Sequence, residues 1–214
     1  MNTIQHNLIV ALSLCASFVI PNIASAVAIS GQGTWETTLQ GRDLDGNLAT
    51  AEAYYDTSLN ITWLANANYA MTSGYTPAYT FGMMTWAAAN AWAAGLNPHG
   101  SGITGWRLPT TVDVGSNGCS SSNIYQGVDC GYNLTAHSEM SHMFYVTLGD
   151  KAYYSTSGIH QPGYGLSNTG PFSNLQSYIY WSATGYARNL NDAWYFRFDD
   201  GGQTNLDNTI KHYA

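Results

Sequence analysis

The clearest periodic pattern of apolar positions lies in residues 85–96, where apolar side chains recur at helical spacing. The stripe consists of Trp86, Ala89, Ala93 and Leu96. Thr85 precedes it as a good N-cap, and Gly95 is placed to end a helix. The pattern therefore predicts a helix over residues 85–96.

A second helix is predicted from Ser138 to Gly149. Glu139 falls in its first turn, where the helix dipole favours a carboxylate. The expected buried face consists of Met140, Met143, Phe144 and Leu148.

Three other stretches carry strand patterns. Residues 52–64 hold two β-rich halves around a turn at 56–58, which predicts a hairpin. A short strand is expected around residues 34–39, within a loop-like stretch. Residues 178–184 form another predicted strand.

Residues 193–198 predict the next strand, with Trp194, Phe196 and Phe198 on one face. Residues 199–202 follow with turn chemistry. The stretches 97–135 and 150–177 are long and rich in Gly, Asn, Ser and Pro. We therefore expect one α+β domain with a small antiparallel sheet, two helices and long loops.

The N-terminus predicts a secretory signal peptide. Residues 8–20 are apolar, and Ala24 and Ala26 form a small-x-small site. Cleavage is expected after Ala26, which leaves residues 27–51 as an N-terminal extension. Lipid attachment at Cys15 is the weaker alternative, because Leu14 before it is large.

After removal of the signal peptide, Cys119 and Cys130 remain. An even pair in an exported chain predicts a disulfide that closes a short loop. A metal or redox pair is the alternative, but it lacks CxxC spacing and further cysteines.

Charged residues make up only 9% of the chain, and the net charge is −7. Such a chain lacks the clustered cations that nucleic-acid binding requires. Sixteen Tyr and seven Trp residues indicate a surface for contact or a core built from rings. No apolar membrane span follows the signal peptide.

The chemistry-bearing motifs are sparse. Asp43, Asp45 and Asn47 offer oxygen side chains at alternate positions, either as a calcium loop or as a plain turn. His137 and His142 do not have the spacing of a zinc protease motif. Gly-x-Ser-x-Gly is absent. We expect no enzyme and no cofactor, with calcium as the alternative.

The run Trp106-Arg107-Leu108-Pro109 predicts a rigid corner, because Pro109 fixes its own φ and extends the residue before it. We expect Arg107 to pair with a carboxylate, and a ligand-binding cation is the alternative. The possible partners that we consider are Asp192, Asp199 and Asp200.

Five segments together resemble the bacterial Lcl C-terminal domain family, whose fold is similar to C-type lectin-like and sulfatase-modifying-factor domains. The segments are residues 56–64, 84–96, 105–110, 180–182 and 193–201. The resemblance implies structural roles for Trp106, Arg107, Leu108, Pro109, Tyr180, Trp181, Ser182 and Trp194. The calcium-binding triplets of true C-type lectins, Glu-Pro-Asn and Gln-Pro-Asp, do not occur.

Residues 41–47 and 170–174 further resemble a subgroup of exported proteins that often end in a Pro-Glu-Pro sorting signal (PEP-CTERM). This sequence ends at residues 211–214 without that tail or the family's usual final strand. We therefore expect residues 52–214 to be a shortened member of the family.

The function expected from these features is a secreted or bacterial cell-surface binding or adhesion module for an extracellular glycan or protein. The candidate contact residues are Tyr75, Tyr79, Tyr153, Tyr154 and Tyr164, which alternatively pack the loops down. A structural matrix protein and an enzyme of the formylglycine-generating type are the other hypotheses.

Overall fold

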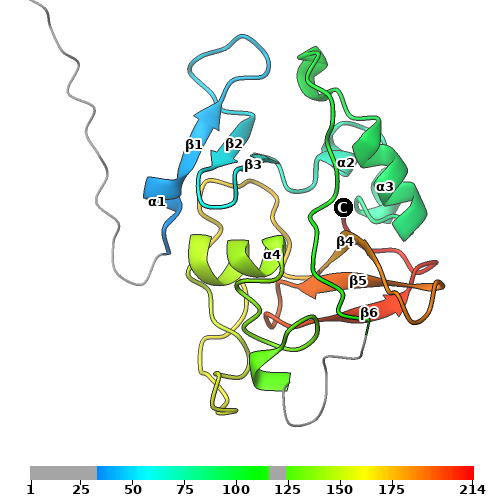
Figure 1. Cartoon of the computed structure of the whole chain (residues 1–214). Helices are drawn as coiled ribbons and strands as arrows, with labels where there is room; N and C mark the ends of the chain where they lie inside the picture. Colours follow the sequence, from blue (N-terminus) through cyan, green and yellow to red (C-terminus); the bar gives the residue numbers. More distant parts are fainter. Residues whose placement is uncertain (1–32, 116–123) are drawn as a thin grey trace, which may run out of the picture.

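The computed structural model describes residues 33–115 and 124–214. They form an α+β arrangement, as predicted, but with two three-stranded antiparallel sheets in place of one (Figure 1). The predicted signal peptide and Cys119 lie outside the described residues. The disulfide with Cys130 therefore stays a prediction.

The first sheet has the strand order β1-β2-β3, formed by β1 (Leu39–Arg42), β2 (Ala53–Asp56) and β3 (Ile61–Leu64). The predicted hairpin is confirmed as β2 and β3, which pair in antiparallel register. The strand expected around residues 34–39 is wrong over most of its length. A helical turn, α1 (Trp35–Thr38), stands there because Thr38 N–H and Oγ1 both bond to the Thr34 carbonyl at 3.0 Å.

The second sheet contains β4 (Ile179–Gly185), β5 (Asp192–Arg197) and β6 (Gln203–Asp207), in that order. The first two were predicted, and the expected turn at residues 199–202 connects β5 to β6. Gly201 is required in this turn, since its φ is +79° and a Cβ there would lie 2.6 Å from Tyr145 Oη.

The predicted helix over residues 85–96 is confirmed as α3 (Trp86–Ala94). Thr85 Oγ1 accepts the Ala88 N–H at 3.4 Å. The helix predicted over residues 138–149 is divided into α4 (Glu139–His142) and a π-helical turn, η4 (Met143–Thr147). The remaining helical turns are α2 (Tyr69–Thr72), η1 (Ala78–Thr80), η2 (Pro98–Gly100) and η3 (Ile124–Gln126).

Successive side chains of a strand point to opposite faces of a sheet. On β4 and β5, each face contributes buried side chains to a different core cluster. Trp181 and Tyr195 pair across β4 and β5 and pack with α3. Tyr180 and Phe196 pair one position further along and pack with α4 and η4. The face toward α4 and η4 includes the predicted residues Met140, Met143, Phe144 and Leu148, all buried.

The segment after β6 returns to the core. His212 exchanges backbone hydrogen bonds with Met84 at 2.8 and 2.9 Å. Tyr213 bonds to both Ile179 and Trp181 on β4. Through residues 212–213, these bonds connect Met84, which lies just before α3, to the second sheet.

Within the described part of the chain, no helix combines the length and the apolar character needed to cross a bilayer.

Candidate functional site

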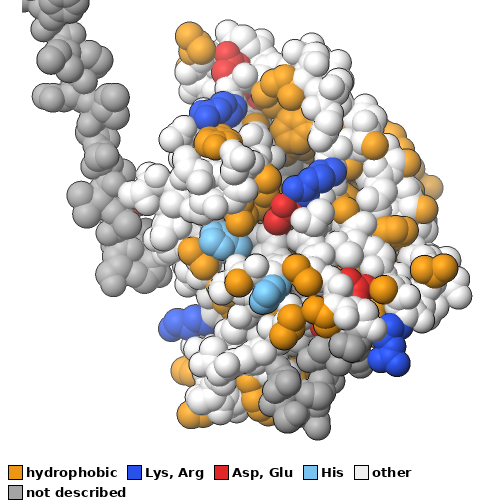
Figure 2. All heavy atoms as spheres, viewed as in Figure 1, with side chains coloured by type: hydrophobic (Ala, Val, Ile, Leu, Met, Phe, Trp, Pro, Cys, Tyr) orange, Lys and Arg blue, Asp and Glu red, His pale blue; other side chains and the backbone are white. Residues whose placement is uncertain are grey.

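A cleft of about 620 Å³ lies where the first sheet, α3, α4 and the segment 103–109 meet. Its lining is mainly apolar and aromatic. Figure 2 shows hydrophobic side chains in the hollow between the first sheet and this segment, beside a touching pair of basic and acidic side chains. The lining residues used below are Arg42, Asp43, Trp63, Trp106, Arg107, Leu108 and Glu139.

The segment 105–109 forms one wall of the cleft, in the extended corner that the sequence predicts. Gly105 turns into it with φ +84°, and Leu108 is buried. Trp106 Nε1 donates to the Ile103 carbonyl at 3.2 Å, and Trp106 is half-buried. The Pro109 carbonyl accepts the N–H of Ala183 on β4 at 2.7 Å. This corner therefore holds an indole at the cleft and is fixed to the second sheet.

Arg107 bonds to Glu139 at the first turn of α4, so the partners expected from the sequence are wrong. Its Nη1 and Nη2 lie 2.7 and 2.6 Å from the two Glu139 oxygens. Nη1 also donates to the Leu108 carbonyl at 3.0 Å, and the Thr110 N–H donates to Glu139 at 2.7 Å. One carboxylate thus attaches the corner to α4.

Burial by itself raises the pKa of Glu139, but the hydrogen bonds from Arg107 and the Thr110 N–H outweigh it. The net effect is a lowered pKa for this carboxyl. The hydrogen bonds to Glu139 raise the pKa of the Arg107 guanidinium. Both groups are therefore charged at neutral pH.

The three aspartates considered as partners of Arg107 make their contacts elsewhere. Asp199 and Asp200 bond to Arg197, with closest distances of 2.6 and 3.3 Å. Asp192 begins β5 and its N–H donates to Asn189. Arg197, at the end of β5, pairs with Asp199 and Asp200 because it lies only two or three residues away from them.

The remaining family markers belong to the second sheet, and two of them, Tyr180 and Trp181, also line the cleft. Trp181 Nε1 donates to the Met84 carbonyl at 3.0 Å, and the Ser182 carbonyl accepts Trp86 Nε1 at 2.8 Å. Tyr180 Oη accepts the Gln176 N–H. Trp194 is fully buried with Cys130 and Tyr186 in a small separate cluster.

The five tyrosines predicted as contact residues all lie in the described part of the chain, and none lines the cleft. Tyr153 packs edge-to-face with Tyr154 and Tyr164, with ring centroids 4.7 Å apart in each pair. Tyr75 and Tyr79 are exposed elsewhere, at 57% and 81%. The structure therefore divides the predicted set into a packed loop cluster and separate surface rings.

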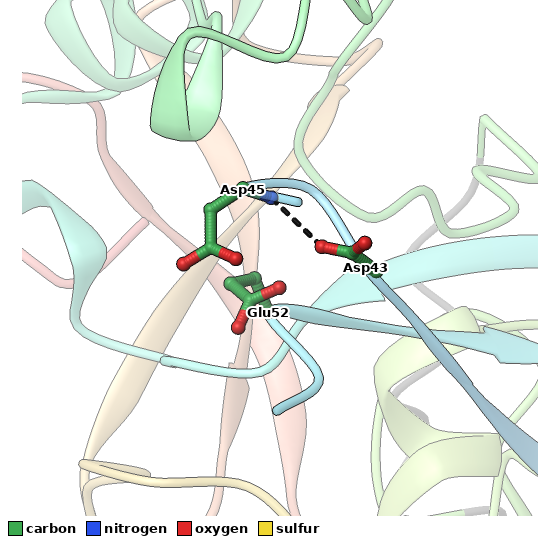
Figure 3. Close-up of side chains that lie close together, drawn as sticks. All are labelled: Asp43, Asp45 and Glu52. Atoms are coloured by element: carbon green, nitrogen blue, oxygen red, sulfur yellow. Dashed lines mark hydrogen bonds between the residues drawn. The ribbon is translucent and has the colours of Figure 1, made fainter. Parts of the chain in front are cut away.

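The loop between β1 and β2 carries a possible cation site. Carboxylate oxygens of Asp43, Asp45 and Glu52 lie within 4.8 Å of one another (Figure 3). Glu52 takes the place that the sequence suggested for Asn47, whose Oδ1 accepts the Ala49 N–H.

The same carboxylates also build the turn. Asp43 Oδ1 accepts the N–H groups of Asp45 and Gly46 at 3.0 and 2.7 Å. A hydrogen bond from Thr50, and then one from the Leu44 N–H, lower the pKa of Glu52. These bonds match the plain Asp-Gly-Asn turn that the sequence predicts as the alternative to calcium.

His137 and His142 do not form a metal site with Glu139, because Arg107 occupies the carboxylate. His142 Nδ1 lies 3.4 Å from the Thr135 carbonyl.

Sequence reasoning missed Trp63, which lies on β3 and lines the cleft. Trp63 and Trp106 reach the same cleft from different elements, and no motif connects them. The one sequence feature that could have indicated Trp63 is its place as a tryptophan on the first predicted hairpin.

The fold and the cleft define a small α+β module whose two sheets and loops border an aromatic-lined groove. The sequence matches the family described as Lcl C-terminal domain over residues 52–214. The chain therefore belongs to this family. No curated protein and no solved structure matches the chain.

Proposed function

We propose that the protein is a non-catalytic binding or adhesion module, exported to the bacterial surface, that holds a segment of an extracellular glycan in the cleft. The observation that carries this proposal is the joint presence of Trp63, Trp106 and the Arg107–Glu139 pair along one groove. The cleft volume of about 620 Å³ suits a small-molecule segment.

A sugar ring has apolar C–H faces and hydroxyl edges. Indole rings such as those of Trp63 and Trp106 offer a large apolar surface to the faces. Carboxylate and guanidinium groups at the border can exchange hydrogen bonds with the edges. An apolar floor with few polar groups is the usual construction of a ligand site.

Binding is favoured over catalysis by the state of the charged groups. A general acid at neutral pH needs a raised carboxyl pKa. Glu139 has a lowered pKa, and both of its oxygens are engaged with Arg107. We therefore assign the pair to shaping and bordering the cleft.

We also propose the finer features that the sequence suggested. These are a C-type-lectin-like fold, the Cys119–Cys130 disulfide and kinship with the PEP-CTERM subgroup. The observation in support of the disulfide is that Cys130 is buried at 1% exposure beside Trp194.

The test is binding of neutral and acidic oligosaccharides to the wild-type chain and to Trp106→Ala, measured by isothermal titration calorimetry. Loss of a central aromatic contact typically costs about 2 kcal/mol, or roughly 30-fold in affinity. Tyr79→Ala is the matched control, since Tyr79 is exposed and lies outside the cleft. Equal losses in both variants, or binding to neither type of oligosaccharide, contradict the proposal.

A further inference from the structure

The charges that border the cleft are balanced. Among the described residues, its charged side chains are two arginines and two carboxylates: Arg42, Asp43, Arg107 and Glu139. A site for a sulfated or uronic-acid glycan needs cations free to meet the anionic groups, most often as planar guanidinium forks. Whether the two arginines are free therefore decides which glycans fit.

Arg107 already uses three of its five N–H donors within the protein. Both terminal nitrogens bond to Glu139, and one of them also bonds to the Leu108 carbonyl. An anionic ligand at this position meets the Glu139 carboxylate as well as the guanidinium. The attraction and the repulsion largely cancel at this distance.

Arg42 is also engaged within its own strand. Its Nη1 donates to the Gly41 carbonyl at 3.0 Å, and its Nη2 donates to Gln40 Oε1 at 3.2 Å. Its guanidinium carbon lies 5.0 Å from the centre of the Tyr55 ring. Asp43 follows directly and adds a negative charge to the same border.

The net charge of −7 also disfavours the binding of anionic ligands, and it acts over a longer range. Polyanionic glycans are repelled by a negatively charged protein unless a local basic patch compensates. Each of the four charged groups at this cleft has a neighbour of opposite sign or an internal hydrogen bond.

We infer that the cleft selects uncharged glycans, and that Glu139 sets this selectivity by neutralising Arg107. The inference rests on the proposed function and goes further by naming the ligand class and the residue that determines it. Neutral sugars interact through stacking and hydrogen bonds, so their affinity depends little on ionic strength.

The experiment compares matched probes on the full purified chain. Neutral hexasaccharides (cellohexaose, laminarihexaose, maltohexaose and chitohexaose) and the anionic hexagalacturonate are titrated at about 50 and 500 mM salt. We expect at least one neutral probe to bind about tenfold or more tightly than hexagalacturonate, with less than a twofold change between salts.

Glu139→Gln supplies the second readout. The amide keeps an acceptor for the Thr110 N–H but leaves the Arg107 charge uncompensated. The ratio of hexagalacturonate affinity to neutral-probe affinity, measured on the same variant, should rise about tenfold over that of the wild type. Should this variant fold poorly, Asp43→Asn removes a different negative charge from the cleft lining, and a smaller gain in hexagalacturonate affinity is expected.

The outcomes are distinguishable. Tight, salt-sensitive binding of hexagalacturonate to the wild type, lost in Trp106→Ala, overturns the inference and leaves the proposed function in place. No binding of any probe overturns the proposed function and the inference with it. A Glu139→Gln variant that folds but gains no anion affinity overturns the role of Glu139.

Discussion

At the scale of single residues, Arg107 shows how one side chain connects several elements. It extends from the corner at residues 105–109 and ends on α4, while the Thr110 N–H reaches the same carboxylate. The Arg107 side chain is 46% exposed and that of Glu139 is 18% exposed, so solvent screens part of their attraction. The value of this pair lies in the fixed bidentate geometry more than in Coulomb energy.

A substitution at Gly105 tests whether the corner at residues 105–109 depends on its backbone conformation. With φ +84°, an L-residue there is strained by about 1–2 kcal/mol, although no atom lies within 4 Å of a Cβ. Gly105→Ala should therefore lower the free energy of unfolding by this amount, measured by urea denaturation. It should also weaken glycan binding, because Trp106 follows directly.

The matched control for Gly105→Ala is Gly95→Ala. Gly95 has φ −91°, and its nearest neighbour to a new Cβ is the Ala91 carbonyl at 3.5 Å. This change should leave stability unchanged or slightly raised. Equal destabilisation by both substitutions contradicts the strain assigned to Gly105.

The sequence predicted that Arg107 pairs with a carboxylate, but not with which one. Glu139 lies 32 residues away and had been recognised only for its place in the first turn of a helix. No local rule connects a corner to a helix N-terminus. The partner is determined by how the two elements pack, which sequence spacing does not encode.

At the scale of elements, α4 depends on its N-terminal residue. Ser138 is buried, and its Oγ accepts the Ser141 N–H at 3.2 Å. Ser138→Ala should cost about 1 kcal/mol, the usual cost of losing a cap. For a chain of this size, we expect a fall of about 2–4 °C in Tm by calorimetry.

Ser58→Ala serves as the control for the cap. Ser58 is exposed in the turn between β2 and β3, and only its backbone N–H bonds to Asp56. A similar fall in Tm for this variant would show that the loss in Ser138→Ala is unrelated to capping.

Elements with strong local signals were predicted correctly, and those stabilised by distant partners were missed. The helix α3 has its cap and apolar stripe within the segment itself. By contrast, β6 reads as polar, and its first residue Gln203 is buried because its amide bonds to Thr111 and to the Asp129 carbonyl at 2.7 Å each. Neither partner is visible from the local pattern.

At the scale of the whole molecule, the division into two sheets and the cleft between them were not predictable from the sequence. Both follow from how segments far apart in the chain come together, such as β3 and the segment 103–109, which line the same cleft. The α+β class was predictable, because it depends only on which elements are present.

His212 predicts how global stability depends on pH. It is 4% exposed among Trp181 and Tyr195, and neither ring nitrogen has a hydrogen-bond partner. Burial lowers the pKa of its imidazole in the folded state. The unfolded chain, with an imidazole pKa of about 6.5, then binds more protons below that pH. Stability present above about pH 6.5 should fall as the pH falls toward the folded pKa.

Urea unfolding between pH 7.5 and 5.0 measures this slope, with His212→Phe as the comparison. The variant should show a flatter dependence over the same range. Burial raises the pKa of Asp150 and Asp200, so these two groups make the folded state more stable as the pH falls. The wild type and His212→Phe share this contribution, so it does not affect their comparison. Identical slopes in the two proteins would rule out His212 as the cause.

The return of residues 212–213 to Met84 and β4 has a consequence for when this protein acquires its structure. The buried Trp181 and the approach to α3 gain these backbone partners only after residue 213 has been synthesised. Contacts between such distant parts of a chain form slowly, because a long loop must close first. The packing of β4 against the approach to α3 is therefore completed only by a segment that follows both of them in the sequence.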